Sequence, residues 1–158
     1  RHKDLVPSNI ICGNESEGLC FGTVFISDYQ SSQRSMDFDK NRFSKGFQSE
    51  NRIIMSNGPN VNCFKDDVFC LGLVLLEVAI MKLPRSLEEN DNESQEDEFA
   101  KKIDSLLNEM DNFYQSRIKG NEKATYEQFS YLMRCMLTLN SDKRPDFMEL
   151  FQMSLLMT

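Results

Sequence analysis

Two side chains near the start of the chain could take part in chemistry together: the carboxylate of Asp4 and the amide of Asn9, in the segment RHKDLVPSN. Phosphoryl transfer gives a reason for this spacing. A carboxylate must meet the attacking hydroxyl, while an amide oxygen one short loop away holds a metal ion on the phosphates. The alternative is that Asp4 and Asn9 are only turn formers around Pro7.

The segment Arg1–Asn9 resembles the catalytic loop of protein kinases, H-R-D-L-x-x-x-N, with His2, Lys3, Asp4, Leu5 and Asn9 in register. The resemblance implies that Asp4 is the base that orients the hydroxyl and that Asn9 is a magnesium ligand. Lys3 replaces an arginine that pairs with a phosphate, and it keeps the charge without the two-pronged geometry. At Val6, serine/threonine kinases carry a lysine that contacts the transferred phosphate, and valine gives no charge stabilisation there.

A hairpin is expected next. The segments Asn9–Cys12 and Leu19–Ser27 are rich in β-branched and aromatic residues and flank a loop with Gly and Asn, which predicts two antiparallel strands. The second ends at Asp28-Tyr29-Gln30, where kinases carry D-F-G, and the resemblance implies that Asp28 binds the magnesium ion that bridges the phosphates. Gln30 replaces a glycine whose backbone freedom lets this segment change conformation.

Residues 31–58 occupy the position of the kinase activation segment, a loop that becomes ordered when an introduced phosphate pairs with basic side chains. The segment is polar throughout, and its candidate phosphate acceptors are Ser31, Ser32, Ser35, Ser44 and Ser49. The alternative interpretation is a flexible, serine-rich surface loop without a regulatory role.

The activation segment of kinases closes with A-P-E, and the corresponding residues here are Ser56-Asn57-Gly58. In the family this glutamate pairs with an arginine near the end of the domain, which Arg144 of SDKRPDF matches. A buried guanidinium without a partner is costly. We therefore expect either that another acid, such as Glu50, pairs with Arg144 or that this corner is loose.

The most apolar stretch is Asp66–Met81, DDVFCLGLVLLEVAIM. From Val68 onward only Gly72 and Glu77 interrupt the apolar run, which predicts a helix that is buried on all sides and forms the axis of the core. Its first two residues are acids that stand at the expected N-cap, where they can accept from free N–H groups and gain from the helix dipole.

This stretch also resembles the central helix of the kinase C-lobe, whose D-V-W-S-L-G start matches Asp67–Gly72. In the family this aspartate accepts hydrogen bonds from the backbone of the catalytic loop. The resemblance therefore implies that Asp67 holds His2–Asp4 in shape, in addition to capping the helix.

Three closing helices are predicted in residues 99–158. The first has apolar residues spaced by three and four: Phe99, Ile103, Leu106, Leu107, Met110 and Phe113. The second begins at the capping box Thr125-x-x-Gln128 and carries Phe129, Leu132, Met133, Met136 and Leu137. The third begins at Asp146-x-x-Glu149, with Phe147, Leu150, Phe151 and Leu155 facing inward. They correspond in order to the closing helices of the kinase C-lobe, and Arg144-Pro145 is the most specific mark.

The charge of the chain is acidic, with 18 Lys and Arg against 25 Asp and Glu. Seven of these acids lie in Glu88–Glu98, which predicts a solvated acidic loop or, alternatively, a docking surface for basic partners. The sequence has no basic stripe, so nucleic-acid binding is disfavoured.

The five cysteines form no C-x-x-C pair and His2 is the only histidine, so we expect reduced thiols and no zinc site. Without an apolar signal segment, we expect a soluble, cytoplasmic protein that does not contact membranes.

The resemblance extends from His2 to near Leu155 and implies one domain, residues 1–158. Its expected fold is mainly α with a small β-hairpin, a protein kinase-like C-terminal lobe without the N-lobe. The first hypothesis is a serine/threonine protein kinase fragment that transfers phosphate from ATP with Mg²⁺ to a protein substrate. Because the Gly-rich loop and the strand lysine are not in the sequence, transfer requires an N-lobe and the isolated chain is expected to be inactive. The second hypothesis is a pseudokinase-like interaction module that binds protein partners through the acidic loop and the following helix.

Overall fold

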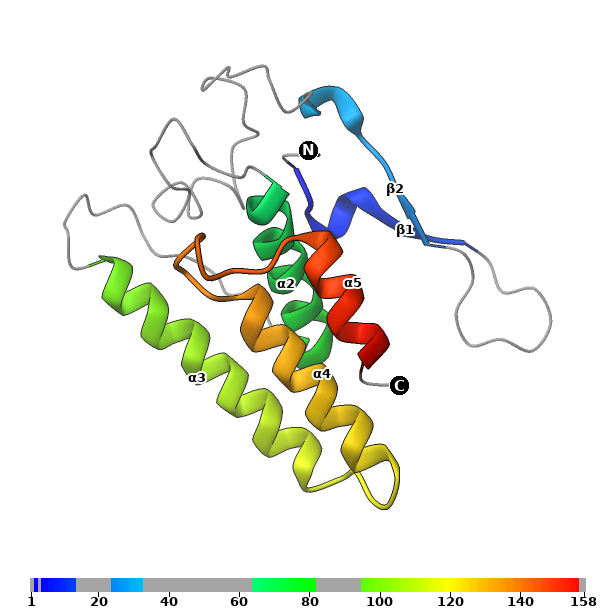
Figure 1. Cartoon of the computed structure of the whole chain (residues 1–158), viewed down its shortest axis with the longest axis vertical. Helices are drawn as coiled ribbons and strands as arrows, with labels where there is room; N and C mark the ends of the chain where they lie inside the picture. The colour runs from blue at the N-terminus through cyan, green and yellow to red at the C-terminus, as the bar shows by residue number, and fades with distance from the viewer. Residues whose placement is uncertain (1, 3, 14–23, 33–63, 82–94, 157–158) are drawn as a thin grey trace.

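The computed structural model describes residues 2, 4–13, 24–32, 64–81 and 95–156. Within these residues the chain is mainly helical with one two-stranded antiparallel sheet, as the sequence predicts (Figure 1). The elements are β1 (Ile10–Cys12), β2 (Val24–Ile26), α2 (Phe64–Ile80), α3 (Gln95–Gln115), α4 (Glu122–Met136) and α5 (Phe147–Leu156), with 3₁₀ turns at Pro7–Asn9 and Tyr29–Ser31.

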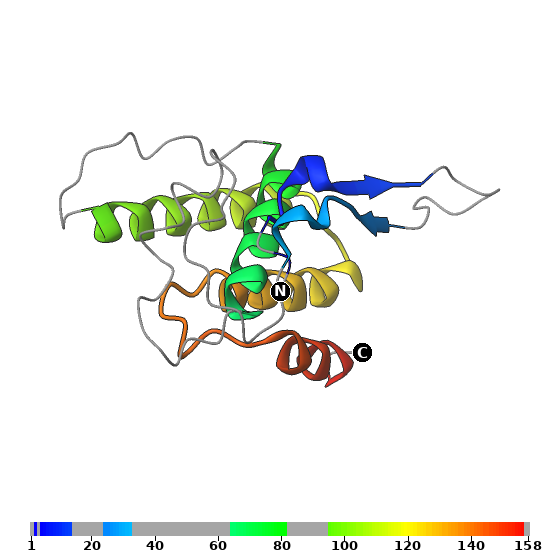
Figure 2. The same cartoon turned by 90° about the horizontal axis from the view of Figure 1, so that it is seen from above.

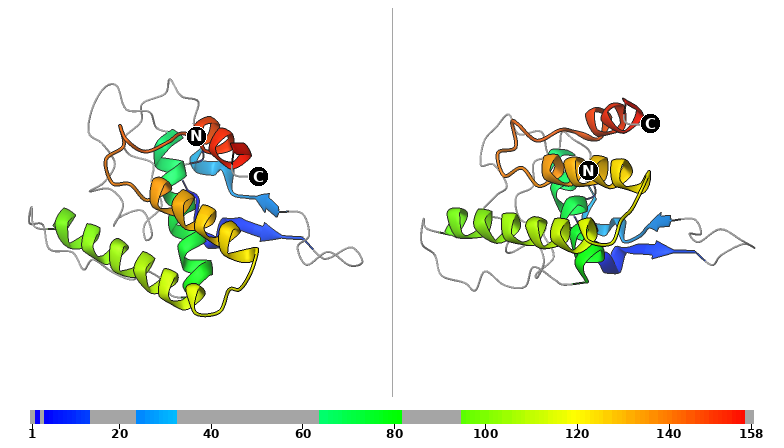
Figure 3. Two further views of the ribbon diagram at one scale, coloured as in Figure 1. Left: turned by 60° about the horizontal axis from the view of Figure 1, so that its bottom comes forward. Right: turned by 90° about the horizontal axis from the view of Figure 1, so that it is seen from below.

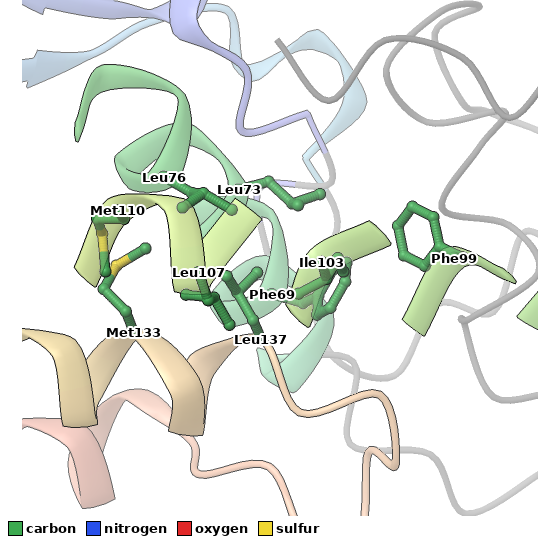
Figure 4. Close-up of a cluster of buried hydrophobic side chains, with 9 residues drawn as sticks. All are labelled: Phe69, Leu73, Leu76, Phe99, Ile103, Leu107, Met110, Met133 and Leu137. Atoms are coloured by element: carbon green, nitrogen blue, oxygen red, sulfur yellow. The ribbon is translucent and has the colours of Figure 1, made fainter. Parts of the chain in front are cut away.

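Helix α2 forms the centre of the fold. Helices α3 and α4 pack side by side against it, and α5 lies next to α4 on the outside (Figures 2 and 3). Figure 4 shows the core where the first three helices meet, with Phe69, Leu73 and Leu76 of α2 among its members. The other members are Phe99, Ile103, Leu107 and Met110 of α3, Met133 of α4, and Leu137 just after it.

The predicted start of α2 is wrong by two residues. The helix begins at Phe64, so Asp66 and Asp67 stand within its first turn and not at the N-cap. Carboxylates in the first turn still gain from the positive end of the helix dipole. The shift places both acids where their side chains can contact other segments.

The prediction that α2 is buried on every side is wrong at its C-terminal end. Side chains are buried continuously from Asp66 to Cys70 and at most positions up to Leu76. Beyond this point Val78 is 63% exposed and Met81 is 86% exposed. The difference arises because α3 and α4 cross α2 and do not run alongside it, so the described neighbours cover only part of its length (Figure 2).

Gly72 lies where α2 and α4 approach each other closely. A Cβ atom at this position would be 3.0 Å from Leu137 Cδ2 and 3.1 Å from Met136 Cβ, which is tighter than ordinary van der Waals contact. A residue without a side chain therefore lets the two helices pack at this distance.

The boundaries of α3 and α4 also differ from the prediction. Helix α3 begins at Gln95, so residues 95–98 of the predicted acidic loop belong to the helix, while 88–94 lie outside the described residues. Helix α4 begins at Glu122, so the predicted capping box at Thr125 and Gln128 lies inside the helix. The predicted apolar positions of both helices are buried or partly buried except Phe113, which is 47% exposed.

Helix α5 begins where the sequence predicts, but it is less buried than expected. The carboxylate of Asp146 accepts from the backbone N–H groups of Met148 and Glu149, and Glu149 Oε2 accepts from Asp146 N, which completes a capping box. The prediction of inward-facing aromatic residues is wrong, since Phe147 is 40% exposed and Phe151 is 58% exposed. Leu155 is also exposed. The reason is that α5 lies at the outer side of the helical body (Figure 3).

The hairpin projects away from the helices (Figure 2). Its strands pair antiparallel with Ile10 opposite Ile26 and Cys12 opposite Val24, so the paired segments are shorter than the predicted strands. Residues 14–23, between the strands, lie outside the described part of the chain. The hairpin brings the residues after β2 back to the His2–Asn9 loop.

None of the helices in the described residues is both long enough and apolar enough to cross a membrane.

Candidate functional site

The His2–Asn9 loop lies at the N-terminal end of α2 (Figure 1). The backbone N–H of His2 donates a hydrogen bond to Asp67 Oδ2 at 2.6 Å, and both residues are buried. This is the contact that the sequence predicts between the central helix and the loop. The bond joins residues 65 positions apart, so the first turn of α2 fixes the position in space of His2, where the loop begins.

The imidazole of His2 is held on both ring nitrogens. Nδ1 accepts from the backbone N–H of Asp4 at 3.3 Å, and Nε2 lies 3.0 Å from the carbonyl oxygen of Ser27. Because a carbonyl can only accept, these contacts place a ring proton on Nε2. The ring also packs edge-on against Tyr29, with 5.1 Å between ring centroids. His2 thus links the loop to the end of β2.

Asp4 and Asn9 are in direct contact. The Asn9 amide nitrogen donates to the backbone oxygen of Asp4 at 2.9 Å and to its Oδ2 at 3.2 Å. Pro7–Asn9 forms a 3₁₀ turn, closed by a hydrogen bond from Asn9 N to Val6 O, and this turn folds Asn9 back over Asp4. Since the amide nitrogen faces Asp4, the amide oxygen is directed elsewhere.

Asp28 joins this cluster through its neighbour Ser27. The backbone N–H of Ser27 donates to Asn9 O at 2.8 Å, and its carbonyl contacts His2. Asp28 itself has φ of 60°, in the left-handed region, which aspartate tolerates better than most residues. Its carboxylate is exposed and accepts from Gln30 N at 3.4 Å.

The structure therefore brings His2, Asp4, Asn9 and Asp67 into one hydrogen-bonded cluster, with Asp28 one residue from it. Of the predicted phosphate acceptors, Ser32 donates its hydroxyl to His2 O at 3.4 Å, and the backbone of Ser31 lies in the adjacent 3₁₀ turn. Lys3, Ser35, Ser44, Ser49, Glu50 and the segment 56–58 lie outside the described residues.

The oxygen atoms of Asp4, Asn9 and Asp28 are the kind of ligand that Mg²⁺ prefers. Among the described residues, the His, Cys, Asp and Glu side chains form no group of three that could hold a metal ion. A cation at this place would therefore depend on the amide oxygen of Asn9 as well as on carboxylates.

Arg144 is the most buried charged side chain at the same end of α2, with 1% of its surface exposed. Its guanidinium donates to three backbone carbonyls, those of Lys65, Thr138 and Leu139, at 2.8–2.9 Å. It also stacks over the ring of Phe69, with 4.6 Å from the central carbon to the ring centroid. Burial lowers the pKa of Arg144, and the charge of a nearby acid opposes this shift.

That acid is Asp66, whose Oδ1 lies 3.6 Å from Arg144 Nη1. The first of the two expected alternatives, that another acid pairs with Arg144, is therefore confirmed with Asp66 as that acid, while Glu50 lies outside the described residues. Sequence reasoning missed Asp66 because it treated both acids as helix caps. The two adjacent acids are themselves a signal. The contact with the His2–Asn9 loop needs only one carboxylate, so the other acid requires a different partner.

A second polar cluster lies between α3 and α4. Asp111 Oδ1 accepts from Tyr126 Oη and Ser130 Oγ, each at 2.7 Å, and Oδ2 pairs with Arg134. Burial raises the pKa of Asp111, but the hydrogen bonds from Arg134, Ser130 and Tyr126 together hold it below its ordinary value. Burial and the bond to Asp111 raise the pKa of Tyr126. None of the four residues in this cluster was among the predicted site residues.

An apolar groove of about 590 Å³ lies between the C-terminal parts of α2 and α3 and the start of α4. Aromatic side chains of Tyr114, Tyr126 and Phe129 line it, and none of the predicted site residues does. The groove is thus separate from the His2–Asn9 loop.

No protein-family model matches the chain, and neither the curated proteins nor the solved structures contain a match. The resemblance to protein kinases therefore depends on the sequence motifs, and the hydrogen bonds described above are the structural observations that bear on it.

Proposed function

We propose that this chain is a protein kinase-like C-terminal lobe that, together with an N-lobe, transfers phosphate from ATP to serine or threonine residues of proteins. The main support is the hydrogen bond from His2 N to Asp67 Oδ2, because it joins two separate motifs of the resemblance across 65 residues. A chance match between short motifs gives no reason for the two segments to meet in the fold.

In this proposal, Asp4 orients the attacking hydroxyl. Its carboxylate is held by Asn9 Nδ2, and its backbone N–H is held by the His2 ring. Both contacts reduce the freedom of Asp4, and such positioning is the main contribution of a protein to phosphoryl transfer.

Asn9 and Asp28 would hold Mg²⁺, which neutralises charge on the phosphates of ATP. The hydrogen bonds from Asn9 Nδ2 to Asp4 leave the amide oxygen for a cation. Asp28 follows Ser27, whose backbone is bonded to Asn9 and His2, and its exposed carboxylate is accessible to a ligand from solution.

The second candidate function is a pseudokinase-like interaction module without catalysis. Val6 favours it, because a half-buried valine replaces the lysine that serine/threonine kinases place near the transferred phosphate. In this case the arrangement around Asp67 serves the fold, and protein partners bind the acidic residues 88–98 and the helix that follows.

The test is phosphate transfer from labelled Mg²⁺–ATP to a generic basic protein by the chain joined to a kinase N-lobe. We expect transfer that falls by at least 100-fold in Asp4→Asn, since general-base contributions are about 10²–10⁴-fold. Asp104→Asn, the same change at an exposed position of α3, is the control and should leave the rate unchanged.

Absence of transfer, or transfer that is insensitive to Asp4→Asn, would falsify the kinase proposal. In that case the interaction module is tested by neutralising the seven acids of Glu88–Glu98 and comparing captured protein partners. An unaltered set of partners would contradict a docking role for these acids.

A further inference from the structure

The first turn of α2 is held by two segments that lie far apart in the sequence. On one side Asp67 accepts from His2 N, which begins the His2–Asn9 loop. On the other side Arg144 donates to Lys65 O and lies 3.6 Å from Asp66. Three consecutive residues of α2 are therefore fixed by contacts from opposite ends of the chain.

Arg144 fixes this turn more firmly than an ordinary ion pair would. Its three bonds to backbone carbonyls use the fork geometry of the guanidinium, and they connect α2 to the segment after α4. Lys65 Nζ adds a further link, to Asp142 O at 3.4 Å. The loop between α4 and α5 is thereby fastened to the turn that carries Asp67.

Residues 65–67 belong to one helical turn, so they move together. A displacement of Lys65 changes the position of the Asp67 carboxylate, which is only 2.6 Å from His2 N. The His2 ring in turn contacts Asp4 N. A continuous chain of short contacts therefore leads from Arg144 through α2 to Asp4.

We infer that Arg144, together with Asp66, is a positioning residue for the His2–Asn9 loop and is not only a stabiliser of the fold. The effect of this positioning on catalysis rests on the proposed function. Displacements of about 1 Å at an active site can reduce rates by about 10²-fold. The positioning itself does not depend on catalysis and can be measured without ATP.

His2 supplies a specific reporter because it is the only histidine in the chain. Its ring C–H resonances in NMR spectra report on the contacts to Asp4 and Ser27. The test compares these resonances between the unaltered chain, Arg144→Lys and Asp66→Asn, at a temperature where circular dichroism shows each protein to be folded. Arg144→Lys keeps the charge but cannot make the three carbonyl bonds.

We expect both variants to displace the His2 resonances by more than their line width. The matched control is Asp111→Asn, which weakens a carboxylate–arginine cluster between α3 and α4 and should leave the His2 resonances in place. If Arg144→Lys does not fold, Asp66→Asn decides, because it removes the ion pair between Arg144 and the first turn of α2 while the three carbonyl bonds of Arg144 keep the chain folded.

Resonances that stay in place in the folded variants, with only a lower melting temperature, would show that Arg144 stabilises the fold without positioning the loop. Displacement by Asp111→Asn to the same extent would also overturn the inference, because the effect would then be a general response to destabilisation. Neither result depends on phosphate transfer, so failure of this inference is distinguishable from failure of the kinase proposal.

Discussion

The first turn of α2 and the Asp111 cluster both pair a carboxylate with an arginine, but they differ in burial and in reach. The side chains of Arg144 and Asp66 are 1% and 5% exposed, whereas those of Arg134 and Asp111 are 39% and 19% exposed. The contacts of Arg144 span up to 79 residues, while those of Asp111 join neighbouring helices at most 23 residues apart.

The difference in burial limits what each cluster can do. Arg144 is satisfied mainly by backbone carbonyls that water cannot replace, so its loss exposes several buried groups at once. Arg134 is accessible to water, which can substitute for part of its interaction. The buried cluster therefore determines how distant segments are arranged, and the half-exposed cluster adds stability to a contact between adjacent helices.

The largest expected effect is that of Arg144→Met. It removes the hydrogen bonds to three carbonyls and the cation beside buried Asp66, so we expect a loss of about 3–5 kcal/mol in the free energy of unfolding. Urea denaturation followed by circular dichroism measures this loss. Arg134→Met is the matched change in the second cluster and should cost less than half as much. Equal losses would remove the distinction between the clusters.

The next effect is that of Asp67→Ala, which leaves the buried N–H of His2 without its acceptor. We expect a loss of about 2–3 kcal/mol, more than the ~1 kcal/mol typical of an exposed helix cap. Asp146→Ala, at the capping box of α5, provides that reference in the same protein. If the two variants lose the same stability in urea denaturation, Asp67 acts only as a first-turn acid of α2.

Asp111→Asn tests the half-exposed cluster, whose contribution to stability depends on pH. We expect it to cost about 1–2 kcal/mol at pH 7, because an amide cannot accept from all three donors as well as a carboxylate does. The folded-state pKa of Asp111 lies below its ordinary value of 3.8, so on acidification the unfolded chain binds this proton first. The stabilisation is therefore present above pH 3.8 and is lost as the pH falls through the folded-state pKa.

The measurement is the difference in unfolding free energy between the unaltered chain and Asp111→Asn as a function of pH. The difference should be constant near neutrality and shrink below pH 3.8. A difference that grows on acidification would contradict the direction given for this pKa.

The smallest loss of stability is expected for a solvent-exposed ion pair, which serves as the baseline for the two clusters. Lys123 and Glu127 lie 3.9 Å apart on α4, with side chains 69% and 64% exposed. Glu127→Gln should cost about 0.3–0.5 kcal/mol at low salt and less at high salt. A loss as large as that of Asp111→Asn would mean that burial does not explain the difference between the clusters.

Much of the fold can be predicted from local sequence patterns. The apolar run of α2, the three-and-four spacing in α3 and the capping box at Asp146 each depend on residues close together in the chain. The contact between Asp67 and the His2–Asn9 loop was also predictable, since the resemblance links those two motifs.

The exposure of α5 could not be predicted in the same way. An apolar face on a helix shows which side is available for packing, but it does not show whether another element covers that side. Phe151 fits the inward pattern and is nevertheless 58% exposed. The same reasoning applies to Val78 at the end of α2, where the described helices no longer cover the apolar surface.

Short-range spacing in the sequence is sufficient to predict which segments become helices and which oxygen-bearing side chains lie near each other along the chain. That Asp66 is the acid beside Arg144 is evident only from the folded chain. Successive residues on a helix point about 100° apart, so one acid contacts Arg144 and the other His2. The partner of Asp66 depends on the path of a segment up to 79 residues away, and no local pattern records that path.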